Sequence, residues 1–158
     1  MKKFVAREKL APVIRRLKAR GKRVVFANGC FDLLHVGHLR YLQGAKKAGD
    51  VLVVALNTDA SVRRLKGASR PLMPLRERVE LIAALDCVDY VTSFGEPSAG
   101  KTLTLLRPSL QAKGSDYSTD SVPEAALMKS LGGGVVITGD PKDHSTSDLI
   151  KKIKKAFR

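Results

Sequence analysis

The stretch VVFANGCFDLLHVGH, residues 24–38, decides the fold. It begins with four apolar residues, typical of a short buried strand, and continues into a loop that opens with Asn28 and Gly29. The segment that follows, residues 36–48, is rich in Leu, Ala and Lys and predicts a helix that stops at Gly49. A strand, a glycine-containing loop and a helix in this order predict the first half of a βαβ unit.

Strands alternate with helices along the rest of the chain. Further strands are predicted at 51–56, 88–92, 109–112 and 135–138, and further helices at 7–20, 75–85, 99–107, 122–131 and 146–156. The strands are continuous apolar runs, as expected when helices cover both faces of a parallel sheet. We therefore expect a Rossmann-like, doubly wound α/β fold with a parallel sheet of about five strands, formed by one domain over residues 1–158. Such sheets bind ligands at the carboxyl ends of their strands, where the strand order reverses.

The chain is strongly basic, with a formal net charge of +14. This charge favours anionic partners such as nucleotides, sugar phosphates, nucleic acid or acidic membrane. Much of it lies at the two ends, in MKKFVAREK and KKIKKAFR, where solvated termini are the simpler explanation. Aromatic residues make up 5% of the chain, few for stacking on bases, so no specific nucleic-acid partner is expected.

Membrane insertion and a resident metal are not indicated. No apolar run approaches the roughly 18 residues of a membrane-spanning helix, and the N-terminus lacks the apolar core of a signal peptide. Cys30 and Cys87 stand far apart, which suits a reducing compartment and forms no zinc framework. We expect a cytoplasmic protein that does not associate with membranes.

His35 and His38 bracket the start of the helix predicted at 36–48. Both side chains should project from one side of the helix start, where its free N–H groups and positive dipole end also point. Imidazoles beside a helix N-terminus can stabilise the charge of a phosphate in a transition state. A capping histidine and half of a metal site are the alternatives, and the metal site lacks a third ligand at zinc spacing.

A second stretch competes for phosphate chemistry. Residues 95–102, GEPSAGKT, match the P-loop pattern G-x-x-x-x-G-K-[ST]. A P-loop also needs a carboxylate for Mg²⁺ after another strand, and Asp140 is only a loose candidate. Ser98 is a good helix N-cap, which would place Gly100 and Lys101 in a first helical turn and leave no loop to wrap a phosphate. We therefore expect no P-loop here.

Several motifs together indicate a family. NGCFDLLHVGH, NTDASVRRLKG-x-SRP, RERVELIAAL, CVDYV, AKGSDY and HSTSDLIKKI follow one another between about residues 24 and 153. In this order and spacing they resemble the H-x-G-H, cytidylyltransferase-like nucleotidyltransferases, and within them the branch that makes ADP-heptose for lipopolysaccharide, in its form without a sugar kinase domain. The resemblance implies transfer of AMP from ATP, with Mg²⁺, to heptose 1-phosphate, with release of pyrophosphate. It also implies a homodimer.

The resemblance assigns roles residue by residue. It implies catalytic roles for His35, His38 and Lys66, the last reaching the reacting phosphates from the mobile stretch ASVRRLKG. It implies nucleotide binding by a larger set: Asn28, Gly29, Phe31, Asp32, Gly37, Arg78, Lys113, Gly114, Asp116, Ser145 and Thr146. Structural roles compete at two positions, because Phe31 is also a candidate core aromatic and Ser145 with Asp148 forms a helix-capping pair.

Two departures from the branch leave the acceptor open. Ser115 stands where a second glycine is usual and would narrow the pocket, and His144 is unusual before the Ser-Thr run and receives no role. Within the fold, the alternatives are a glycerol-3-phosphate cytidylyltransferase using CTP and an FAD synthase-like adenylyltransferase acting on FMN. An alternative of another class is a basic nucleic-acid-binding module that has kept the fold.

Overall fold

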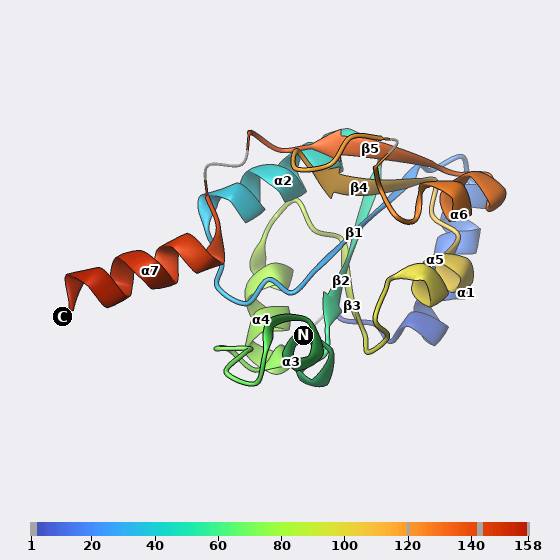
Figure 1. Ribbon diagram of the computed structural model, residues 1–158. Coiled ribbons are helices and arrows are strands. Elements are labelled where there is room, and N and C mark those ends of the chain that lie inside the picture. Colours follow the sequence, from blue (N-terminus) through green and yellow to red (C-terminus); the bar gives the residue numbers. More distant parts are fainter. Residues whose placement is uncertain (1–2, 120, 142–143, 158) are drawn as a thin grey trace.

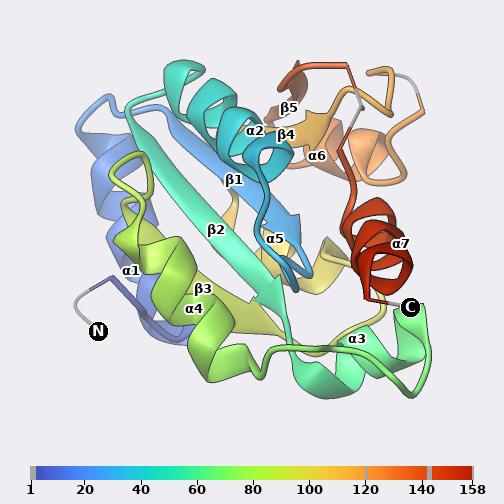
Figure 2. The ribbon, with the colours of Figure 1, turned by 90° about the vertical axis from the view of Figure 1, so that its left-hand side faces the viewer.

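The centre of the protein is a five-stranded sheet in the order β3-β2-β1-β4-β5. The computed structural model describes residues 3–119, 121–141 and 144–157. All strand pairs are parallel. The strands are β1 (Val24–Gly29), β2 (Val51–Asn57), β3 (Tyr90–Phe94), β4 (Leu110–Gly114) and β5 (Gly134–Thr138). The predicted doubly wound fold is confirmed, and Figure 2 shows the strands side by side in this order.

Helices cover both faces of the sheet. They are α1 (Arg7–Ala19), α2 (Val36–Lys47), α3 (Asp59–Lys66), α4 (Leu75–Ala84), α5 (Gly100–Leu106), α6 (Ala125–Ser130) and α7 (Thr146–Ala156). In Figure 1, α2 and α4 lie on one side of the sheet, and α1, α5 and α6 lie on the other. Each face therefore has its own apolar layer.

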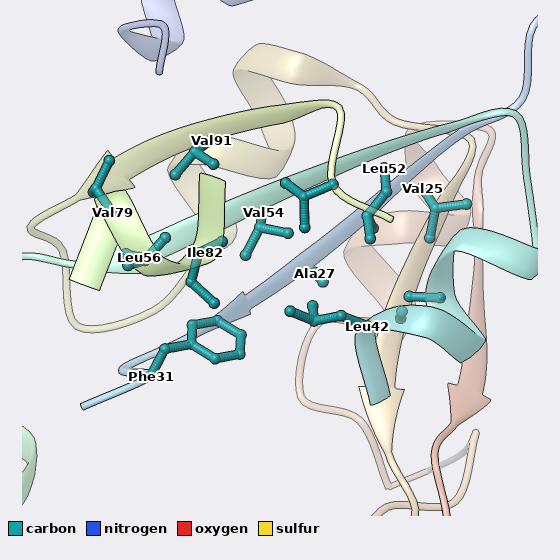
Figure 3. Packing of buried hydrophobic residues seen from close by; sticks show 13 residues of the cluster. Val25, Ala27, Phe31, Leu42, Leu52, Val54, Leu56, Val79, Ile82 and Val91 are labelled. Carbon is teal, nitrogen blue, oxygen red and sulfur yellow. The ribbon is translucent and has the colours of Figure 1, made fainter. Parts of the chain in front are cut away.

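The strand pattern explains the two layers. Along β1, Val25 and Ala27 belong to the cluster under α2 and α4, while Val24 and Phe26 belong to the cluster under α1, α5 and α6. Successive strand residues point to opposite faces, so a strand buried on both faces must be apolar throughout. Figure 3 shows the first cluster, with Phe31 just beyond the end of β1.

Most elements lie within two residues of their predicted bounds. α6 begins at Ala125, three residues after its predicted start, because residues 122–125 form a turn closed by a hydrogen bond from the Ala125 N–H to the Val122 carbonyl. Two further differences also have local reasons. β3 begins at Tyr90, two residues after the predicted start, because Val88 lies in a turn and the carboxylate of Asp89 accepts a hydrogen bond from the Leu52 N–H. The stretch after Thr58 forms α3, which was not predicted as a helix. Thr58 caps it by accepting from the Ser61 N–H. It is only eight residues long and has three apolar residues, Ala60, Val62 and Leu65, so its apolar positions are too few to establish a helical repeat from the sequence.

The final helix, α7, has the bounds that the sequence predicts. Ser145 caps it, its hydroxyl accepting from the Asp148 N–H at 3.1 Å, so the predicted capping pair is present. Figure 1 shows α7 extending away from the sheet, and none of its residues is buried. Over the described part of the chain, no helix has the length and apolar character needed to cross a membrane.

Candidate active site

A cavity of about 650 Å³ opens where the sheet order reverses. Its walls come from the residues that follow β1, β2, β4 and β5, together with the N-termini of α2 and α7. Nearly all predicted site residues line it: Asn28, Gly29, Phe31, Asp32, His35, Gly37, His38, Lys66, Lys113, Gly114, Asp116, Ser145 and Thr146. The topology brings these residues together because the carboxyl ends of parallel strands share one edge of the sheet.

The imidazoles of His35 and His38 are stacked, with ring centroids 3.8 Å apart and an interplanar angle of 23°. Burial, and then the neighbouring His35, lower the pKa of His38 to about 4. Burial, and then His144, lower the pKa of His35. Both rings are therefore neutral at pH 7, and neutral rings can stack without charge repulsion. The Nδ1 atoms of both are buried and have no hydrogen-bond partner among the described residues.

Phe31 supports this pair from the core side. Its ring is 4% exposed and meets the ring of His38 edge-on, with centroids 5.2 Å apart. Its backbone φ of 47° lies in the left-handed region, which non-glycine residues rarely adopt away from functional loops. A Cβ at Gly29 would lie 3.1 Å from the Phe31 ring, so the glycine lets the ring turn back over the strand. Phe31 is thus both a core residue and part of the cavity wall.

Asp32 holds the loop between α3 and α4 rather than presenting a free carboxylate. It accepts hydrogen bonds from the N–H groups of Leu72 at 2.8 Å and Met73 at 3.0 Å, and from Nε of Arg70. Burial by itself would raise the pKa of Asp32, but these hydrogen bonds outweigh burial and lower it. Asp32 therefore stays ionised and anchors Arg70, which also lines the cavity.

Arg78 is the exception among the predicted site residues, because it does not line the cavity. Its side chain is fully buried and donates to the carbonyls of Cys30 at 2.6 Å and Asn57 at 2.9 Å. It also pairs with Asp59 at 2.6 Å. The predicted contact between Arg78 and phosphate thus has no geometric support. Its donors instead join the carboxyl ends of β1 and β2.

A row of polar side chains crosses the switch between β1 and β4. Nε2 of Gln111 lies 3.4 Å from Oδ1 of Asn28 and 3.4 Å from Oε2 of Glu124. Lys113 pairs with the same Glu124 oxygen at 3.2 Å, and its ammonium lies 5.5 Å from the centre of the Tyr117 ring. Gln111 therefore orients Asn28, and Glu124 holds Lys113 at the cavity edge.

Sequence reasoning missed two residues on α2. Arg40 pairs with Asp140 at 2.7 Å, and the Tyr41 hydroxyl donates to the Ala112 carbonyl at 2.8 Å. Both line the cavity. They follow His38 within one helical turn, and residue 41 shares a face with residues 37 and 38, so helical spacing could have indicated Tyr41. Ser115 donates to the Asp140 carbonyl, which directs its hydroxyl toward the loop after β5.

The P-loop-like stretch lies outside this cavity. Glu96 pairs with Arg7 at 2.8 Å, and the Thr102 hydroxyl accepts from the same arginine at 3.1 Å. Lys101 is exposed within α5. The N-cap is Ala99, one residue after the predicted Ser98, although the Ser98 hydroxyl still accepts from the Gly100 N–H at 3.4 Å. The stretch is a helix start with structural contacts, as expected.

The fold and the cavity define a class of protein. A parallel α/β sheet with stacked H-x-G-H imidazoles at a helix start, in a cavity rich in cationic groups, characterises nucleotidyltransferase-like domains. The chain belongs to the cytidylyltransferase-like family, whose model matches residues 26–152.

The relatives of this chain include bifunctional proteins and one solved structure. It is 51% identical over 148 residues to the bifunctional protein HldE of Geobacter sulfurreducens, covering 94% of this chain and 30% of that protein. It is 42% identical over 147 residues to HldE of Pseudomonas paraeruginosa, covering 93% of this chain and 31% of that protein. The chain thus spans under a third of these relatives. The crystal structure of the lipopolysaccharide core biosynthesis protein from Thermoplasma volcanium GSS1 matches with a TM-score of 0.67 and 31% identity, over 77% of this chain and 100% of that chain.

Proposed function

We propose that this protein transfers AMP from ATP to a heptose 1-phosphate, giving an ADP-sugar and pyrophosphate. The observation that carries the proposal is the stacked His35–His38 pair, which faces the cavity at the start of α2. The similarity to proteins named HldE and to a lipopolysaccharide core biosynthesis protein supports a sugar-phosphate acceptor.

The proposed reaction is an in-line displacement. A phosphate oxygen of the acceptor attacks the α-phosphorus of ATP, and the bond from that phosphorus to the oxygen bridging to the β-phosphate breaks. The bonding electrons leave with pyrophosphate. The nucleophile is already an anion, so no base has to remove a proton, and catalysis rests on positioning and charge stabilisation.

The residues of the cavity can both position the substrates and stabilise the developing charge. His35 and His38 would donate N–H groups to the oxygens of the α-phosphate, where charge accumulates in the transition state. Lys66, exposed at the end of α3 and lining the cavity, would neutralise the phosphates. Lys113 and the loop at Asn28 and Gly29 would hold the nucleotide at the strand ends.

Mg²⁺ enters this proposal as part of the substrate. Among the described residues, no group of three or more His, Cys, Asp or Glu side chains is placed to hold a metal ion. Asp32 and Asp140, which line the cavity, are occupied by Arg70 and Arg40. Mg²⁺ characteristically keeps several waters and binds substrate phosphates, so we assign it to the MgATP complex.

A pyrophosphate-release assay tests the proposal. ATP and CTP should each be offered with heptose 1-phosphate, glycerol 3-phosphate and FMN, and ATP with heptose 1-phosphate should give the highest kcat/KM. Preference for CTP with glycerol 3-phosphate, or for ATP with FMN, would assign the protein to another branch. Sub-micromolar affinity for a duplex or single strand at physiological salt, without any nucleotidyl transfer, would favour the nucleic-acid-binding alternative. Homodimer formation and a cytoplasmic location stay predictions.

A further inference from the structure

A third imidazole lies beside the stacked pair. His144, in the segment that precedes α7, lines the cavity, and its ring centroid is 6.4 Å from that of His35 with an interplanar angle of 24°. His35 is the shared neighbour, because its ring also stacks on that of His38 at 3.8 Å. The His35 ring, at the start of α2, thus has a second imidazole on each of two neighbouring segments: His38 in α2 and His144 just before α7.

This arrangement depends on close packing of two distant segments. A Cβ at Gly37 would lie 3.0 Å from Nδ1 of His35 and 3.3 Å from Cβ of His144. The missing side chain at Gly37 therefore makes room for both histidines. The first turn of α7 is held to the same loop by the Thr146 hydroxyl, which donates to the Leu33 carbonyl at 3.2 Å. His144 is thus positioned against the H-x-G-H segment by contacts on both sides.

The wall around His144 is suited to an anion. It offers an imidazole and the N-terminus of an eleven-residue helix. The hydroxyls of Ser145 and Thr146 lie in the same wall but donate to Asp148 and to the Leu33 carbonyl, so they hold the helix start in place. The nearby carboxylates already have partners, since Asp140 pairs with Arg40 at 2.7 Å and Asp148 accepts from the Ser145 hydroxyl at 2.6 Å. Free carboxylates or amides would bind a sugar hydroxyl better, because they accept its hydrogen bond.

We propose that His144 binds the β- and γ-phosphates of ATP, the part that leaves as pyrophosphate. The inference rests on the proposed function, which places the α-phosphate at His35 and His38. The triphosphate must continue beyond that point, and His144, which lines the same cavity beside His35 just before α7, is the next imidazole that it can meet. His144 thereby extends the H-x-G-H pair into a three-imidazole phosphate site.

Two variants separate the N–H group of His144 from the packing of its ring. His144→Phe keeps a flat ring without a hydrogen-bond donor, and His144→Gln keeps a donor. Calorimetry should measure the affinity of each for magnesium pyrophosphate and for adenosine. We expect His144→Phe to weaken pyrophosphate binding about 10-fold, as loss of a hydrogen bond to a charged group does, and to leave adenosine binding unchanged. His144→Gln should recover most of the affinity.

Lys151→Ala is the matched control, because it removes a charge from exposed α7 outside the cavity. It should leave both affinities unchanged. Equal weakening of pyrophosphate and adenosine in His144→Phe would show a packing role and overturn the proposal. Unchanged pyrophosphate affinity in His144→Phe, or a loss of kcat with KM for ATP unaltered, would overturn it too.

The binding experiment needs no sugar acceptor, so the two proposals can fail separately. If the unaltered protein binds pyrophosphate through His144 but produces no ADP-sugar from heptose 1-phosphate, only the assigned acceptor is wrong. If it produces ADP-sugar while His144→Phe binds pyrophosphate normally, only the role of His144 is wrong.

Discussion

Arg78 donates from Nη2 to Oδ1 of Asp59 across 2.6 Å, and this ion pair joins α4 to the first turn of α3. The arginine is fully buried, and its Nη1 donates to the carbonyls of Cys30 and Asn57. One guanidinium therefore connects the carboxyl ends of β1 and β2 to the helices α3 and α4. Cys30 and Asn57 line the cavity, so this connection shapes the candidate site without touching a substrate.

Arg78→Ala should lower the free energy of unfolding by about 3–5 kcal/mol, because it leaves three carbonyls (Cys30, Asn57 and Met73) and the Asp59 carboxylate without their donor. Urea unfolding followed by circular dichroism measures this. Arg76→Ala, an exposed position on the same helix, is the control and should change stability by no more than about 0.5 kcal/mol. If Arg78→Ala were as stable as Arg76→Ala while losing turnover, Arg78 would act on the substrate after all.

His38→Ala and His35→Ala should each reduce kcat about 10²-fold or more, since each removes a donor to developing phosphate charge. KM for ATP should change much less. Steady-state pyrophosphate release with saturating acceptor separates the two constants. Near-normal kcat in both variants would move catalysis away from the H-x-G-H pair.

Stability should fall on acidification because of His38. Its pKa of about 4 in the folded protein lies below the usual value of 6.5, so the unfolded chain binds the proton more readily. Stability is therefore fully present above pH 6.5, declines as the pH falls toward 4, and loses about 3 kcal/mol from this group. Urea unfolding at several pH values measures the slope. His38→Gln should flatten it, and an unchanged slope would show that His38 titrates normally.

Lys101→Ala should leave nucleotidyl transfer within about 2-fold of the unaltered protein, because Lys101 is an exposed residue of α5 and does not line the cavity. Lys66→Ala is the informative comparison, since Lys66 lines the cavity and should lose activity strongly. A loss in Lys101→Ala equal to that of His38→Ala would restore the P-loop interpretation of residues 95–102.

Local patterns in the sequence determined the order and kind of most elements. The apolar runs became strands, and the amphipathic stretch after Ser145 became α7 with the predicted bounds. The H-x-G-H segment was placed correctly at the start of α2. These signals come from residues that lie close together in the sequence, so they can be read from the sequence alone. α3 was missed because it is only eight residues long, too short for a repeating apolar face to stand out.

Only the tertiary structure decided which distant residues meet. Arg78 occupies a helix position that the sequence cannot distinguish from a phosphate contact. Its burial follows from how α4 packs beside β2 and β3, which lets its side chain reach the carbonyls of Cys30 and Asn57. His144 reaches His35 because the start of α7 is held at Leu33, more than a hundred residues earlier in the chain. Residues 95–102 match a phosphate motif but fold beside α1, away from the cavity. Contacts of this kind arise from the strand order and the path of the chain, and no local pattern encodes either.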